Sequence, residues 1–233
     1  MKKIIFWLSL ILLVLLFSIS FSIFSSKKVN PVISFVEAKE LAETWVNKIY
    51  EIPSMEHWQY ADVVQVYDYN GDLKRYYFLF IKDVANISLT SIEQIPTFFP
   101  NLSQCYHDNF CTNNMATISI RAYTYPTGRS DAGWATRFYR GIPFFIYDKI
   151  EISKRVEAAY PGKKMGRPVF LNYREEIAYN LIDKNQPVNS EAIPKSSSII
   201  VVDGWRNFTI RTISQRISGY SKIDEEMKGA AWA

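Results

Sequence analysis

The sequence is poor in the side chains that metal centres and thiol enzymes depend on, with two cysteines and two histidines among 233 residues. A structural zinc site commonly takes four such ligands, so a Cys2His2 site would use every cysteine and histidine of the chain. Glycine and proline are not enriched, at 9 and 10 residues, and there is no low-complexity tract, acidic tail or short internal repeat. The composition is that of a folded chain.

Most of the chain has no excess of positive charge. The net charge is +4, but the first 28 residues contain four lysines and no acidic residue. Without those four, the 27 basic residues fall to 23 and balance the 23 acidic ones. Proteins that follow nucleic-acid phosphates need clustered positive charge, so nucleic acid is not an expected partner.

What the chain does have is a long apolar run at its start. Residues 4–24 are apolar except for four serines, and lysines stand on both sides of them. These 21 residues would form a helix of about 31 Å, roughly the hydrocarbon thickness of a bilayer. The run is longer than the usual signal-peptide core of about 7–15 residues, which favours an uncleaved anchor. A cleavable signal is the alternative, because serines at positions 18–22 supply small residues.

The charges before this run indicate its orientation. The free amino terminus, Lys2 and Lys3 favour a cytoplasmic N-terminus, which places the chain after Lys28 outside the membrane. The predicted organisation is a membrane segment at 1–28, a short stalk at 29–33, an extracytoplasmic domain at 34–213 with a candidate linker or mobile loop at 183–198, and a polar tail at 214–233.

The first part of the predicted domain is a helix followed by a β-hairpin. Ser34 and Glu37 fit a capping box, and apolar residues recur at helical spacing up to Ile49. Two runs rich in β-formers, 60–68 and 73–82, flank Asn70-Gly71, a strong hairpin signal. The second run is apolar on both faces, so we expect a cover on each side of it.

The remaining elements give an α+β fold class: an N-terminal transmembrane helix followed by a mainly antiparallel sheet with packed helices. They are a half-buried strand at 116–122, a long loop at 124–141, a strand at 144–152, a short helix before Pro161, a strand at 169–173, a helix at 175–182, and a second tight hairpin around Asp203-Gly204 that joins 199–202 to 205–213.

One stretch resembles a known group of modules. The helix Ala38-x-x-x-Ala42-x-x-Trp45, followed by VYDYNGDLKRYYFLF, is similar to PepSY-type modules and to the propeptides of streptopain-like cysteine proteases, over about residues 34–83. The resemblance implies an amphipathic helix packed against a meander and a binding or inhibitory role outside the membrane. It carries no catalytic residue over to this chain.

The segment CYHDNFC contains both cysteines, Cys105 and Cys111, and admits three interpretations. A zinc site would need His107 and His57 or Asp108 to complete the ligand set. A catalytic thiol would need one histidine as its base, but His107 is only two residues from Cys105. A disulfide needs only an oxidising compartment and a turn, which Asp108 and Asn109 favour. We predict the Cys105–Cys111 disulfide.

A second segment has the composition of a recognition surface. Residues 129–139 carry two arginines, an aspartate and three aromatics in a glycine-containing loop, a mixture typical of binding sites. The predicted contacts with a ligand or partner are Arg129, Asp131, Trp134, Arg137 and Tyr139.

The function predicted from these features is a membrane-anchored extracytoplasmic binding module without catalytic activity, cofactor or metal. It would regulate a protease or associate with the cell envelope, bound to the membrane through residues 4–24 and to a protein or glycan outside it. The alternatives are an anchored hydrolase and a carbohydrate-binding domain that uses the 15 Tyr and 6 Trp residues.

Overall fold

The computed structural model describes most of the chain after the apolar run: residues 32–49, 58–82, 89, 91–98, 113–122, 137–171, 176–203 and 207–219. Residues 4–24 lie outside these ranges. In the part that is described, no helix is both long and apolar enough to cross a bilayer. The described chain is α+β, as predicted, with one mixed sheet and helices packed on it.

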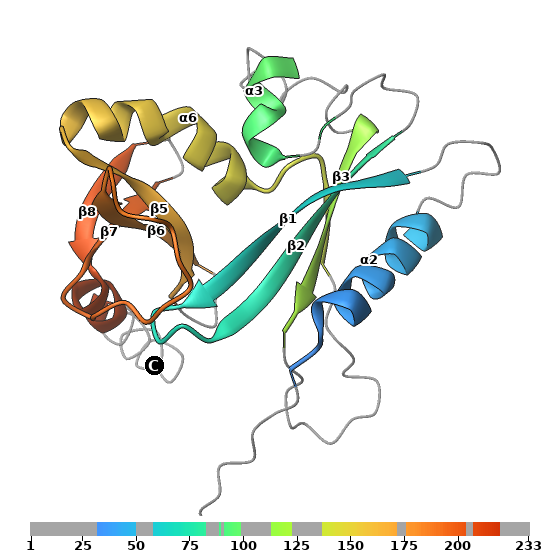
Figure 1. The fold of residues 1–233 in the computed structure, drawn as a ribbon, viewed down its shortest axis with the longest axis horizontal. Coiled ribbons are helices and arrows are strands. Elements are labelled where there is room, and N and C mark those ends of the chain that lie inside the picture. The colour runs from blue at the N-terminus through green and yellow to red at the C-terminus, as the bar shows by residue number, and fades with distance from the viewer. Residues whose placement is uncertain are drawn as a thin grey trace, which may run out of the picture. The chain divides into compact units, whose positions relative to one another are not determined.

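The sheet has eight strands in the order β4-β3-β2-β1-β5-β6-β7-β8 (Figure 1). Every pair of neighbours is antiparallel except β1 and β5, which are parallel and matched only at Tyr67–Val169 and Asp68–Phe170. Two four-stranded meanders therefore meet at a short parallel seam. The strands are β1 (Trp58–Asp68), β2 (Leu73–Lys82), β3 (Met115–Arg121), β4 (Arg137–Arg140), β5 (Lys163–Phe170), β6 (Ile177–Asp183), β7 (Ser198–Val202) and β8 (Phe208–Thr212).

Helix α2 (Phe35–Ile49) covers one face of the first meander, as predicted. Its capping box is present: the Ser34 Oγ accepts a hydrogen bond from the Glu37 amide at 3.2 Å, and Glu37 Oε2 accepts one from the Ser34 amide at 3.0 Å. The small residues Ala38 and Ala42 are fully buried and let the helix lie close to the sheet. The cluster beneath it includes Tyr76, Phe78, Phe80, Ala116, Ile118 and Ile120.

Helix α6 (Phe144–Ala159) covers the opposite face, so β2 is enclosed on both sides, as its sequence requires. Leu79 and Ile81 of β2 pack there against Ile146 and Tyr147 of α6. Two short helices, η2 (Ile92–Gln94) and α3 (Ile95–Phe98), lie on the same side. Farther along, α6 buries Ile152 and Val156 against Met165, Tyr179 and Ile200 of the second meander.

Two predictions of element type are wrong. Residues 144–152 are helix rather than strand: the helix begins directly after Pro143, and Ile152 and Val156, four residues apart, are both fully buried. The predicted helix at 175–182 is strand β6. Pairing with β5 and β7 sets its conformation, and its neighbours Ala178 and Tyr179 are buried in separate clusters, as on opposite faces of a strand.

The predicted exposed face of β3 is also buried. Thr117 donates to the carbonyl of Gly141 at 2.9 Å, and Ser119 accepts from Arg75 Nη1 at 2.8 Å, so both hydroxyls have partners in the interior. The end of the predicted loop at 124–141 is strand β4, which pairs with β3.

Both predicted hairpins are present, but their connections are longer than two residues. In the first, Gly71 takes φ +87, its amide donates to the Asp68 carbonyl, and Asp68 N donates to Asp72 O at 2.9 Å. This pattern encloses three residues, the length at which a glycine-containing bulge is usual. In the second, β7 ends at Val202 and β8 begins at Phe208, so the predicted tight Asp203-Gly204 turn is wrong.

The segment between β6 and β7 lies against the first hairpin. The Ile193 amide donates to Tyr69 O at 2.7 Å. A Cβ atom placed on Gly71 would come 3.0 Å from the carbonyl oxygen of Ser190. Residues 184–197 therefore connect neighbouring antiparallel strands of one sheet and contact the tip of the other meander. After β8, residues 213–219 are helical.

Candidate functional site

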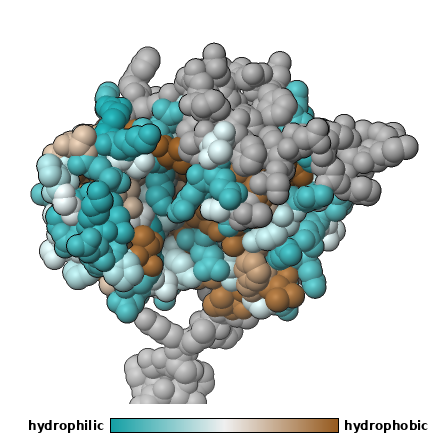
Figure 2. All heavy atoms as spheres, turned by 45° about the horizontal axis from the view of Figure 1, so that its top comes forward, coloured by the Kyte–Doolittle hydropathy of each residue, from teal (hydrophilic) through white to brown (hydrophobic). Residues whose placement is uncertain are grey.

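A groove lies where α6 crosses β1 on the face opposite α2. It contains two adjoining pockets of about 160 and 280 Å³, which share Ile92, Glu93, Ile146 and Lys149. One wall is the η2 turn and the other is α6, and β1, β5 and β6 supply the floor of the smaller pocket. Figure 2 faces the side on which α6 and α3 lie in Figure 1, and shows apolar patches among polar ones. The smaller pocket is lined by Asp62, Val64, Ser91, Ile92, Glu93, Phe145, Ile146, Lys149, Pro168 and Tyr179, and the larger adds Ile150, Ser153 and Lys154.

Asp62 holds the η2 wall in place. The pairing of β1 with β2 shifts register between Tyr60 and Asp62, and such bulges redirect a side chain. One carboxylate oxygen of Asp62 accepts from the Ile92 amide at 2.7 Å, and the other accepts from the Val63 amide at 2.7 Å. The Ser91 hydroxyl accepts from the Glu93 amide at 3.2 Å. The Asp62 carboxylate is therefore engaged in positioning the wall.

Lys149 and Glu93 stand on the opposite walls and have no hydrogen-bonded or ion-paired side-chain partner in the described structure. Burial lowers the pKa of the half-buried Lys149 ammonium, and the negative charge of Glu93 acts in the opposite direction. Among the described residues, the groove thus has two lysines of α6 without a side-chain partner, Lys149 in both pockets and Lys154 in the larger one, and the unpaired carboxylate of Glu93 on η2.

Tyr179 fixes the start of α6 on the second meander. Its hydroxyl donates to the carbonyl oxygen of Phe145, and the Phe145 ring meets the Tyr77 ring edge to face at 4.7 Å between centroids. Burial raises the pKa of Tyr179 well above its ordinary value, with smaller contributions from Asp148 and Tyr77. The hydroxyl is therefore protonated at neutral pH and serves as a fixed donor.

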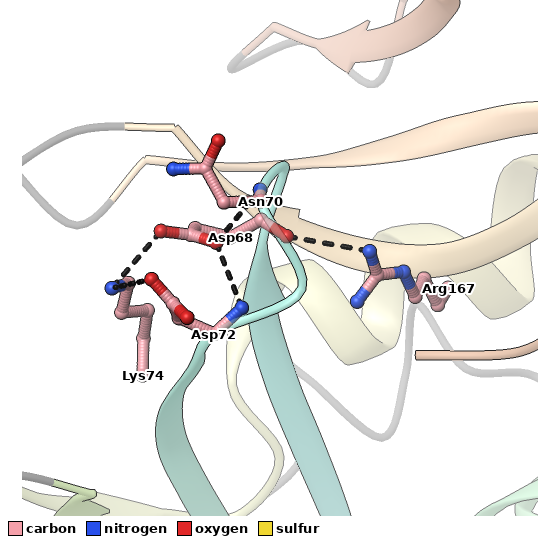
Figure 3. A network of polar contacts seen from close by, with 5 residues as sticks. All are labelled: Asp68, Asn70, Asp72, Lys74 and Arg167. Carbon is pink, nitrogen blue, oxygen red and sulfur yellow. Dashed lines mark hydrogen bonds and ion pairs between the residues drawn. The ribbon is translucent and has the colours of Figure 1, made fainter. Parts of the chain in front are cut away.

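A second polar cluster lies at the seam between the meanders (Figure 3). The Asp68 carboxylate accepts from the amides of Asn70 and Asp72 at 2.8 and 3.0 Å and pairs with Lys74 at 2.9 Å. Arg167 donates through Nη2 to the carbonyls of Asp68 and Glu191, at 3.3 and 2.7 Å. These contacts join β1, β5 and the 184–197 segment.

Arg167 is 4% exposed, and its Nε and Nη1 have no partner among the described residues. Its guanidinium lies 5.3 Å from the centre of the Tyr67 ring, and desolvation lowers its pKa. The two unpaired nitrogens do not share the bidentate fork that binds a carboxylate, since Nη2 is already occupied. This cluster is best explained as a structural connection between the meanders.

The residues predicted to bind are only partly described. Arg129, Asp131 and Trp134 lie outside the described residues, as do Cys105 and Cys111, so the disulfide remains a prediction. Arg137 and Tyr139 both lie on β4, where Arg137 is exposed and Tyr139 is half-buried with its ring 6.2 Å from that of Tyr77. Neither lines the groove.

The groove residues were not recognised from the sequence. Asp62 and Glu93 are separated by 31 positions and Lys149 by another 56, without a motif around any of them. The one available signal was an aspartate inside a strand of β-formers, where a charge is unusual. Within the described ranges, no three His, Cys, Asp or Glu side chains gather in a potential metal site.

Comparisons with protein-family models, with curated proteins and with solved structures found no match to this chain.

Proposed function

We propose that the protein is a membrane-anchored binding module that stands outside the membrane and receives its ligand or partner in the groove between η2 and α6. Residues 4–24 hold it in the bilayer, the N-terminus is cytoplasmic, and the module has no catalytic activity of its own. Regulation of a protease and association with the cell envelope are the roles that such a module would serve.

The observation that carries the proposal is the groove itself. Its smaller pocket of about 160 Å³ is below the usual range of about 300–1,000 Å³ for small-molecule sites. A pocket of this size suits one side chain of a larger partner. Lys149 and Glu93 on its walls have no side-chain partners in the described structure, and unpaired polar groups beside an apolar floor are typical of binding sites.

Two further features support the proposal. Helix α2 lies across the meander of β1, β2 and β3, the arrangement that the resemblance to PepSY-type modules implies, and we propose that the chain is related to them in this region. Among the described aromatic residues, Tyr77, Phe78, Phe80 and Tyr179 are fully buried. These four side chains serve the core and are not available to a ligand.

The test is site-specific photo-crosslinking of the full-length chain in its own membrane. A photoreactive amino acid at Ile150, which lines the groove, is expected to give a discrete adduct. The same group at Val188, which is 54% exposed and is not among the groove residues, is the control and is expected to give none. Equal yields at the two positions, or no adduct at Ile150, would contradict the proposal.

A further inference from the structure

We propose that the groove binds an extended peptide segment, with its main chain between Lys149 and Glu93 and one aliphatic side chain in the smaller pocket. This inference rests on the proposed function and specifies the chemical class of the ligand.

The size and lining of the smaller pocket indicate the side chain. An apolar cavity of about 150 Å³ is large enough to hold benzene, and the smaller pocket measures about 160 Å³. Val64, Ile146 and Pro168 give part of it an apolar surface, and the charged side chains of Asp62, Glu93 and Lys149 line the rest. A leucine-sized group therefore fits and would be removed from water there.

The polar groups on the walls indicate the main chain. An ammonium on α6 donates, and a carboxylate on η2 accepts. A peptide bond carries one acceptor and one donor on opposite edges, so a strand running along the groove meets both walls with the correct group. A peptide can therefore accept a hydrogen bond from Lys149 and donate one to Glu93 at the same time.

Ligands of a single charge fit less well. A carboxylate would be attracted by Lys149 and Lys154 but repelled by Glu93 and by Asp62, which line the same groove. A cation would meet the reverse arrangement. The larger pocket continues along α6 past Ile150 and Ser153, which gives the neighbouring residues of an extended segment a path out of the smaller one.

The experiment is a methyl NMR titration of the full-length chain in lipid nanodiscs, with labelled isoleucine δ1 methyls. Ile92, Ile146 and Ile150 report on the groove, while Ile33 and Ile118, in the cluster under α2, are the internal controls. The probes are acetyl-Gly-Leu-Gly-amide, which has peptide bonds and no charge, and isovalerate, which has the same branched chain on a carboxylate.

We expect the blocked tripeptide to shift the three groove methyls and leave the two control methyls in place, and isovalerate to shift none. Lys149→Met and Glu93→Gln are each expected to weaken tripeptide binding about tenfold, because the first removes a hydrogen bond to a charged group and the second replaces a charged acceptor with a neutral amide oxygen. Lys184→Met and Glu157→Gln change an exposed ion pair and are expected to have no effect.

A response to isovalerate without one to the tripeptide, or a response that Lys149→Met and Glu93→Gln leave unchanged, would overturn the peptide assignment. So would the absence of any response to the tripeptide. If the crosslinked adduct at Ile150 still forms in that case, the groove is a binding site for another ligand class. If the adduct is also missing, the proposed function fails together with this inference.

Discussion

Burial has opposite effects on two ionisable side chains that line the groove, Tyr179 and Lys149. Tyr179 is buried with its hydroxyl bonded to the Phe145 carbonyl, which favours the neutral form that it has at physiological pH. Burial lowers the pKa of Lys149, and among the described residues no ion pair compensates for the desolvation of its ammonium. Tyr179 therefore stabilises the folded protein. Lys149 destabilises it, and a ligand that accepts a hydrogen bond from the ammonium would offset that cost.

Tyr179→Phe is expected to lower the free energy of unfolding by about 1–2 kcal/mol at pH 7, because the Phe145 carbonyl loses its donor. Since the folded-state pKa of Tyr179 is raised, its contribution is complete below about pH 10 and declines as pH rises toward the folded-state value. The variant should therefore lose less stability than the wild type above pH 10. Urea unfolding between pH 7 and 11 measures both effects. Tyr160→Phe, at a position 39% exposed, should match the wild type, and equal profiles for the two variants would contradict this assignment.

Lys149→Met is expected to raise the free energy of unfolding at pH 7. The folded-state pKa of Lys149 is lowered, so the folded protein carries a penalty for the ammonium that disappears only as pH rises above that pKa. A methionine removes the penalty, and the melting temperature is the measurement. The exposed Lys184→Met serves as the matched control and should leave it unchanged. A destabilised Lys149→Met protein would show that the lysine serves the fold rather than a ligand.

Individual helices and strands could be predicted from the sequence where residues close together in the chain determine the local conformation. The capping box at Ser34 and the glycine at position 71 act within a few residues, and both the helix and the hairpin that they predict are present. Residues 144–152 were mispredicted because their β-branched and aromatic side chains suit a strand, whereas burial against both meanders requires a helix. The groove could not be predicted from the sequence, because its two walls, η2 and α6, meet only through tertiary packing.

Gly71→Ala is expected to destabilise the protein by about 1–3 kcal/mol. The substitution places a Cβ on a residue with φ +87 and within 3.0 Å of the Ser190 carbonyl oxygen. Gly162→Ala is the control for backbone strain alone, because its φ is +84 and nothing lies within 4 Å of its Cβ position. Chemical unfolding should show a smaller loss for Gly162→Ala. The reverse order would argue against the contact between the hairpin and the 184–197 segment.

Asp62→Ala is expected to loosen the η2 wall and lower the free energy of unfolding by about 1–3 kcal/mol, since the Ile92 amide loses its acceptor. Hydrogen exchange at the Ile92 amide should accelerate, while exchange in β3 stays slow. Asp183→Ala removes the exposed pair with Lys163 and should cost less than about 0.5 kcal/mol. Unchanged exchange at the Ile92 amide would show that Asp62 does not hold the η2 wall in place.

At the scale of the whole described chain, the groove depends on both meanders. Helix α2 precedes β1–β4 and α6 precedes β5–β8, and the first strands of the two groups, β1 and β5, lie side by side. The two helices cover opposite faces, so α6 extends from the second meander over β1 of the first. The smaller pocket takes its lining from both groups, with Val64 from β1 and Pro168 from β5.

Labelling of a Ser153→Cys variant in intact cells, with a maleimide that does not cross membranes, tests whether the groove lies outside the membrane. Ser153 lines the groove, and the wild type, whose two cysteines are predicted to form a disulfide, is the control. Without lysis, we expect full labelling of the variant and none of the wild type, and slower labelling of the variant in the presence of acetyl-Gly-Leu-Gly-amide. Labelling of the variant only after the cells are broken would place the groove on the cytoplasmic side and contradict the proposed location outside the membrane.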